Sequence, residues 1–222
     1  LTGVAILLIQ TLIDIAIGEP APGLKNALLG GGAGFAATAL GALPALFLRQ
    51  IPQKLEDSLL GMAAGMMLAA SAFSLILPGL EAGTDILGSR PLGAAIVVAG
   101  MSIGVLLMLG LERFVPHEHD STGPCGPLVE RCGRVWLFVF AVALHNLPEG
   151  MAIGSGFAQN DLSVGLPVAV AIALQDIPEG LAVALALRNV NLGAGRAVLI
   201  AAASGLLEPL GVLIGVGLSG GL

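Results

Sequence analysis

Charged side chains are scarce in this sequence. Only 11% of its 222 residues are Asp, Glu, Lys or Arg, and its mean hydropathy is +0.96. Soluble domains carry about 25% charged residues, so a chain this apolar cannot cover itself with a polar surface in water. The sequence therefore predicts an integral membrane protein that is surrounded by a lipid bilayer, and we expect no nucleic-acid partner.

Aromatic residues and cysteine are also rare. The chain has no Tyr, one Trp and seven Phe, whereas it has 33 Gly. Gly-rich helices that pack closely fit this composition better than a barrel with aromatic girdles. The two cysteines, Cys125 and Cys132, fall in one loop at a spacing that is no zinc motif, and they imply no disulfide framework. The expected fold class is all-α, a polytopic transmembrane helix bundle.

Apolar runs of about 20 residues, the length needed to span a bilayer, give the domain organisation. A weaker run over residues 1–17 is interrupted by Gln10 and Asp14, and is a short span or an interfacial helix. We expect no secretory signal there, because no basic region or cleavage site is visible, and we expect Leu1 to be a fragment boundary. The other spans of this single transmembrane domain are expected at residues 27–48, 59–80, 92–111, 135–158, 164–187 and 197–218.

Basic residues orient the expected bundle, because cytoplasmic loops of membrane proteins carry an excess of Lys and Arg. If residues 1–17 span the membrane, seven of the nine basic residues fall on one side. That side includes the long loop over residues 112–134, so we expect this loop to be cytoplasmic and the protein to lie in the plasma or inner membrane. The acids on the other side either concentrate cations at an outer mouth or solvate ordinary loops.

Two copies of one polar pattern interrupt neighbouring spans. They read His-Asn-Leu-Pro-Glu-Gly at residues 145–150 and Gln-Asp-Ile-Pro-Glu-Gly at residues 175–180. Polar and ionisable groups are costly in hydrocarbon and indicate function by default. Positions i, i+1 and i+4 share one face of a helix. The residues on these two faces are His145, Asn146 and Glu149 in the first copy, and Gln175, Asp176 and Glu179 in the second.

Proline accompanies the acids in three spans. Pro148 and Pro178 each delete a helical hydrogen bond, and in lipid the freed carbonyl must find another partner. A bound cation or its water can be that partner, and kinked or broken helices at the midplane are typical of transporter substrate sites. The third span repeats the feature with Glu208 and Pro209.

No Lys or Arg lies in the central half of these three spans to balance the four acids. Unpaired buried carboxylates either are protonated or hold a cation. One imidazole, four carboxylates and two amides suit one or two divalent ions such as Zn²⁺, Mn²⁺, Fe²⁺, Co²⁺ or Cd²⁺, whereas the lack of thiolates argues against Cu(I). We predict a metal site at mid-membrane depth between Pro-kinked helices, with Glu149 and Glu179 placed to bridge. The alternative is a structural hydrogen-bond or proton-relay network.

The two motifs resemble those of the ZIP family of divalent-metal transporters, here a prokaryotic member. That family has HNxPEG on one helix and usually HExPEG on its partner, whereas Gln175 and Asp176 replace His-Glu in this sequence and suggest broader metal selectivity. The resemblance covers the span order from Ala27 to Leu218. It implies transport into the cytoplasm by alternating access with an elevator-like movement, and a homodimer. Since the family has eight spans, we expect two C-terminal family helices to be missing.

The resemblance also implies a binuclear metal site. Its ligands would be His145, Asn146, Glu149, Gln175, Asp176, Glu179 and Glu208. Weaker candidates are Met67 and Ser74, which share one face of a span that the resemblance makes part of the pathway. Met67 is either a soft transient ligand or ordinary core packing. His117 and His119 in the long loop either capture metal that leaves the pore or belong to a solvated loop.

Two other functions compete with metal transport. A membrane metalloenzyme, either an intramembrane hydrolase or a di-metal oxidase, needs His-Glu-x-x-His or repeated Glu-x-x-His, and only one His lies in any span. A proton-coupled carrier of an organic substrate needs a larger polar cavity, and no span carries a basic anchor. We therefore expect a secondary transporter that is not an enzyme, with a divalent metal as its substrate, Zn²⁺ first.

Overall fold

Helices make up nearly all of the described chain, and no strand occurs within it. The computed structural model describes residues 13, 23–114, 127–158 and 160–220, so the expected N-terminal helix falls almost wholly outside it. The helices are α2 (Leu24–Ala42), η1 (Leu43–Leu46), α3 (Gln53–Ala70), η2 (Ser71–Ile76), α4 (Leu77–Leu87), α5 (Arg90–Phe114), α6 (Pro127–Phe157), α7 (Leu162–Asn189), α8 (Ala194–Ser204) and α9 (Leu207–Gly220). The all-α prediction is confirmed.

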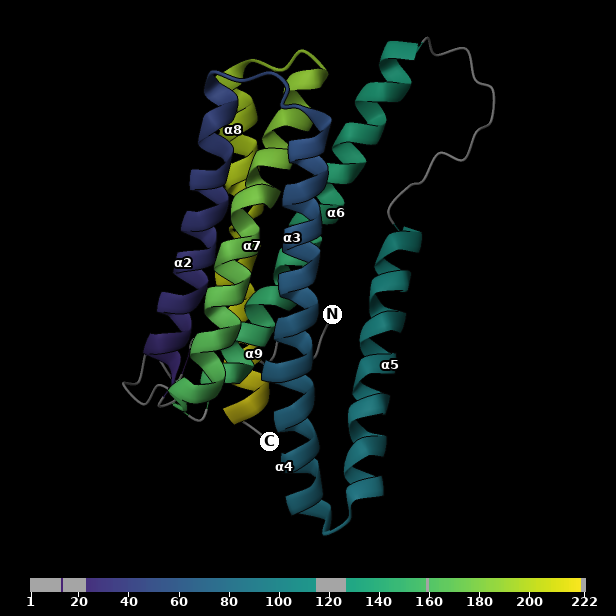
Figure 1. The fold of residues 1–222 in the computed structure, drawn as a ribbon, viewed down its shortest axis with the longest axis vertical. Coiled ribbons are helices and arrows are strands. Elements are labelled where there is room, and N and C mark those ends of the chain that lie inside the picture. Colours follow the sequence, from purple (N-terminus) through teal and green to yellow (C-terminus); the bar gives the residue numbers. More distant parts are fainter. Residues whose placement is uncertain (1–12, 14–22, 115–126, 159, 221–222) are drawn as a thin grey trace.

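These helices divide into a packed bundle and a peripheral arm (Figure 1). In the bundle, α2 packs along α7 and α6 packs along α9, while α8 lies against α2 and α7. In the arm, α3, the π-helical η2 and α4 follow one another as one long helical run, and α5 returns antiparallel to α4. The most apolar window of Gln53–Leu87 has none of its residues buried, compared with 56% for Leu162–Asn189. The interior of the described protein therefore belongs to the bundle.

Four stretches of described helix are long and apolar enough to cross a membrane. They are Leu24–Leu46, Gln53–Leu87, Leu162–Asn189 and Ala194–Ser219, and the apolar helix over Arg90–Leu106 is shorter. These stretches support the prediction of a membrane protein. The expected spans at residues 92–111 and 135–158 fall on α5 and α6 and stay predictions.

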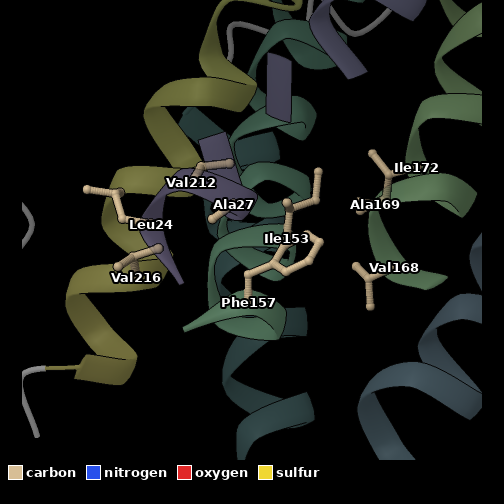
Figure 2. Close-up of a cluster of buried hydrophobic side chains, with 9 residues drawn as sticks. All are labelled: Leu24, Ala27, Ile153, Phe157, Val168, Ala169, Ile172, Val212 and Val216. Carbon is tan, nitrogen blue, oxygen red and sulfur yellow. The ribbon is translucent and has the colours of Figure 1, made fainter. Parts of the chain in front are cut away.

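Two apolar clusters fill the bundle. The first draws on α2, α6, α7 and α9 (Figure 2), and its buried members are Leu24, Ala27, Ile153, Phe157, Val168, Ala169, Ile172, Val212 and Val216. The second draws on α2, η1, α6, α7 and α8, and its buried members are Ala42, Ala45, Val139, Val183, Ala184, Leu185, Leu187, Ala197 and Ala201. Along each of α2, α6 and α7, the two sets of members are separated by about three to four helical turns.

Local chemistry explains several helix ends. Asp161 caps α7, because its carboxylate accepts hydrogen bonds from the Ser163 backbone N–H at 2.8 Å and from the Ser163 hydroxyl at 2.7 Å. These bonds hold the pKa of Asp161 below its usual range. Gly88 ends α4 in the left-handed conformation, at a φ of 64° that glycine adopts without strain, and so turns the chain into α5. Pro127 begins α6, where its missing N–H costs nothing.

The structure departs from the expected spans at two places. Helix α6 begins at Pro127, within the stretch expected as a loop, because its polar first turns continue the helix beyond the apolar run. The stretch expected as one span at residues 197–218 is broken between α8 and α9. Pro209 has no N–H to donate to the Gly205 carbonyl, which instead accepts from the Glu208 N–H at 3.2 Å. This leaves the Ser204 carbonyl without its helical donor.

The close approach of α6 and α9 makes a prediction about stability. A Cβ on Gly211 would meet the Leu147 carbonyl oxygen and would lie 2.9 Å from the Met151 backbone nitrogen. Since overpacking costs about 1–3 kcal/mol, we expect Gly211→Ala to lower the unfolding temperature of the protein in detergent. The matched control is Gly61→Ala on α3, where a Cβ would meet nothing within 4 Å. Equal unfolding temperatures for the two variants would contradict the close approach.

Candidate metal centre

A layer of buried polar side chains lies between the two apolar clusters. On α6 the polar residues fall between Val139 and Ile153, and on α7 they fall between Ile172 and Val183. Two polar residues in the layer, His145 and Glu179, are half-buried. The others are at most 7% exposed, and they are Thr38, Asn146, Glu149, Gln175, Asp176, Ser204 and Glu208. The layer therefore holds all seven residues that the resemblance implies as ligands.

Three of the acids converge on one point. Glu149 comes from α6, and Asp176 and Glu179 come from α7. Each offers a carboxylate oxygen, and these oxygens lie within 4.8 Å of one another. Negative groups so close together in a buried place repel one another unless a cation or protons balance them. The three carboxylates form an oxygen-rich site of the kind that divalent ions occupy.

Unsatisfied polar atoms mark the same layer. Buried polar groups in folded proteins are nearly always hydrogen-bonded, so each exception needs an explanation. Among the described residues, the buried side-chain oxygens without a hydrogen-bond partner all belong to expected ligands: Asn146 Oδ1, Glu149 Oε2, Gln175 Oε1, Asp176 Oδ2, Glu179 Oε1 and Glu208 Oε1. Six acceptors without donors, gathered in one layer, fit a site built to bind cations.

The neighbours of Glu149 place its carboxylate. Gln175 Nε2 donates a hydrogen bond to Glu149 Oε1 across the α6–α7 interface. His145 Nε2 lies 3.6 Å from the same oxygen, one helical turn away on α6. The His145 side chain is 36% exposed, compared with 8% for Glu149. His145 therefore lies at the accessible margin of the site and Glu149 lies within it.

Asn146 joins α6 to the break between α8 and α9. Its Nδ2 donates to the Ser204 carbonyl at 3.1 Å, the carbonyl that the break leaves without a helical donor. With the amide nitrogen used in this way, Oδ1 is the atom free for another partner. The break in the helix thus orients Asn146, an expected ligand. In the sequence, Pro209 was the one sign of this break.

Glu208 lies in the first turn of α9, just after the break. It is near enough to Asp176, Glu149 and Glu179 to interact with them electrostatically. It is nevertheless not part of the group whose oxygens lie within 4.8 Å of one another. Its side chain is 1% exposed, so Glu208 is a fourth buried acid set back from the other three.

The weaker candidates have different outcomes. Met67 is half-buried on α3 and stays a predicted ligand. Ser74 belongs to η2, but its side chain lies outside what the structure describes, and His117 and His119 fall in residues 115–126, which are not described. Sequence reasoning missed Thr38, a buried α2 residue whose hydroxyl donates to the Gly34 carbonyl at 3.2 Å. The one feature of the sequence that could have indicated Thr38 is that it is a lone polar residue in an apolar, Gly-rich span.

The apolar helices and the buried acids define a membrane helix bundle with a candidate cation site in its interior. Comparison with known proteins agrees with this class. Residues 116–221 match the ZIP zinc transporter family. The chain is 62% identical over 219 residues to the zinc transporter ZIPB of Bordetella bronchiseptica, which covers 99% of this chain and 71% of that protein.

Other relatives are similar over most of their length. The chain is 39% identical over 194 residues to the zinc transporter GufA of Myxococcus xanthus, covering 87% of this chain and 75% of that protein. It is 34% identical over 188 residues to the zinc transporter ZupT of Corynebacterium aurimucosum, covering 82% and 70%. The chain belongs to the ZIP family of zinc transporters, as its motifs predicted. It is a metal-ion transport protein, and the prediction that it is not an enzyme is confirmed by these relatives.

The tether between Asn146 and Ser204 makes a prediction about stability. Asn146→Ala leaves the Ser204 carbonyl buried without its donor, and an unsatisfied buried group costs about 1–3 kcal/mol. We expect a lower unfolding temperature for this variant in detergent. The control is Asn26→Ala, which removes an exposed 3.0 Å hydrogen bond to Asn160 and should change the unfolding temperature little. A similar shift in both variants would mean that the buried tether adds nothing.

Proposed function

We propose that this protein carries divalent metal ions, Zn²⁺ first, across the membrane into the cytoplasm through a binuclear site in its buried polar layer. One observation carries the proposal: three carboxylates from α6 and α7 offer oxygens within 4.8 Å of one another. Glu149 and Glu179 bridge the two ions, as expected of acids at the same position of two repeated motifs. Cd²⁺, Fe²⁺, Mn²⁺ and Co²⁺ are further substrates, because oxygen and imidazole ligands accept them as well.

Two ions are proposed because the ligands outnumber what one ion needs. Zinc in proteins is mostly four-coordinate, whereas the seven expected ligands in this layer each offer a nitrogen or oxygen atom. His145 and Gln175 complete a first position beside the bridging acids. Asn146, Asp176 and Glu208 complete a second position toward the break between α8 and α9. Each set includes a buried oxygen that has no hydrogen-bond partner among the described residues.

Alternating access is proposed to arise from sliding of the bundle against the arm. The helices that carry the ligands pack tightly on one another through two apolar clusters. The arm of α3, η2, α4 and α5 has few buried residues, and it meets the bundle chiefly between α3 and α7. A site held on a compact unit can move as one body in an elevator-like transition. We place the protein in the inner or plasma membrane as a homodimer, with the loop at residues 112–134 in the cytoplasm.

Glu149→Ala and Glu179→Ala are each expected to abolish metal transport while the protein stays folded. Each variant removes one of the converging carboxylates, and the bridging role needs both. The measurement is zinc or cadmium uptake by liposomes that contain the purified protein. Asp57→Ala is the control, because Asp57 is an exposed acid on α3, and it should transport at the normal rate. Normal uptake by either of the two site variants would show that the bridging assignment is wrong.

Gln175→His is expected to shift metal preference toward zinc. Gln175 is 2% exposed, and its Oε1 has no hydrogen-bond partner among the described residues. An imidazole there is a borderline-soft ligand in place of a hard, weak amide oxygen. The measurement is competition between zinc and manganese, and between zinc and cadmium, in the same liposomes. An unchanged order of competition would mean that position 175 does not set selectivity.

A further inference from the structure

The carboxylate of Glu208 occupies a recess on α2. A Cβ built on Gly34 would fall within that carboxylate, against both of its oxygens. Glu208 is 1% exposed, and its Oε1 has no hydrogen-bond partner among the described residues. The missing side chain at position 34 thus provides the space in which a buried acid of the candidate metal centre sits.

Gly34 differs from the other tightly packed glycines of the layer. At Gly150, Gly180 and Gly41, an added Cβ would meet a backbone carbonyl of the facing helix. A substitution there forces two helices apart. At Gly34 the nearest atoms belong to the end of a flexible Glu side chain, which moves at small cost compared with a helix backbone. A substitution at Gly34 therefore moves the carboxylate and leaves the helix packing in place.

Contacts of the neighbouring residue Thr38 hold the part of α2 that forms the recess. Thr38 is buried one turn later, and its hydroxyl donates to the Gly34 carbonyl at 3.2 Å. The backbone carbonyl of Thr38 faces Gly180 on α7, next to Glu179. Helix α2 carries no acid of its own in the layer, yet it contacts both the Glu208 carboxylate and the turn of α7 that carries another acid.

We propose that Gly34 is a positioning residue that sets the place of the Glu208 carboxylate relative to Glu149, Asp176 and Glu179, and so tunes how tightly the layer holds a metal ion. This inference rests on the proposed function. Glu208 is set back from the other acids because the recess accepts its carboxylate. An ion between Glu208 and Asp176 therefore meets an oxygen whose position depends on a residue that offers no ligand atom.

Gly34→Ala tests this assignment. The methyl group fills the recess and forces the carboxylate into another rotamer. Residues that orient a metal ligand change affinity by about 10- to 100-fold when they are altered, and we expect a loss of this size in the affinity of the full chain for zinc. The measurement is titration of the purified protein with Zn²⁺ against a competing chelator. The control is Gly32→Ala on the same helix, where a Cβ would meet nothing within 4 Å, and it should bind zinc as the wild type does.

A second substitution separates positioning from general damage. Glu208→Asp shortens the side chain by one methylene and withdraws the carboxylate from the recess. Alone it should weaken zinc binding, but in the Gly34→Ala background it should restore part of the lost affinity, because the shorter acid clears the new methyl group. The unfolding temperature of Gly34→Ala should stay near that of Gly32→Ala, since no helix has to move.

Three results would overturn the inference without touching the proposed function. They are unchanged zinc affinity in Gly34→Ala, additive losses in the double variant, and an unfolding temperature that falls together with the affinity. A wild-type protein that binds no zinc, or that binds it equally well after Glu149→Ala, would instead overturn the proposed function. The two claims are therefore separable in one set of titrations.

Discussion

The structure depends on balancing negative charge in a largely buried layer. Four carboxylates and two side-chain amides lie between two apolar clusters, and their unsatisfied oxygens face one layer. Desolvated like charges are strongly unfavourable, so this arrangement is stable only when protons or cations occupy it. A metal transporter needs such a site. Desolvation of the carboxylates favours binding of a cation, and it also lets protons compete for the same oxygens.

Glycine provides the geometry that gathers these acids. Helices in lipid approach closely where small residues meet, and the layer contains several such contacts between backbones. Gly150 lies against the Glu208 carbonyl, Gly180 lies against the Thr38 carbonyl, and Gly41 lies against the Ile177 carbonyl. These contacts bring α2, α6, α7 and α9 together at the height of the ligands. The abundance of glycine in the sequence, 33 of 222 residues, thus allows the polar layer to be compact.

Much of the helical fold and of the polar layer was predictable from the sequence. The repeated motif fixed which faces of α6 and α7 carry polar residues, because helical periodicity alone places His145, Asn146 and Glu149 together. The break between α8 and α9 was not predictable, since Pro148 and Pro178 have the same local signal as Pro209 and lie inside continuous helices. The Ser204 carbonyl, which the break leaves without a helical donor, accepts a hydrogen bond from Asn146 on α6, a contact between helices far apart in the sequence that no local pattern reveals. The recess at Gly34 was not predictable either, because the pair Gly30 and Gly34, four residues apart, indicates close helix packing but not which side chain packs there.

The proposed metal site can be observed directly by anomalous diffraction at the zinc absorption edge from crystals of the protein grown with Zn²⁺. We expect an anomalous peak among the carboxylates of Glu149, Asp176 and Glu179, at roughly 2.0–2.2 Å from their oxygens, and a weaker peak toward Asn146 and Glu208. A zinc peak found only outside the layer, with these carboxylates free of metal, would contradict it.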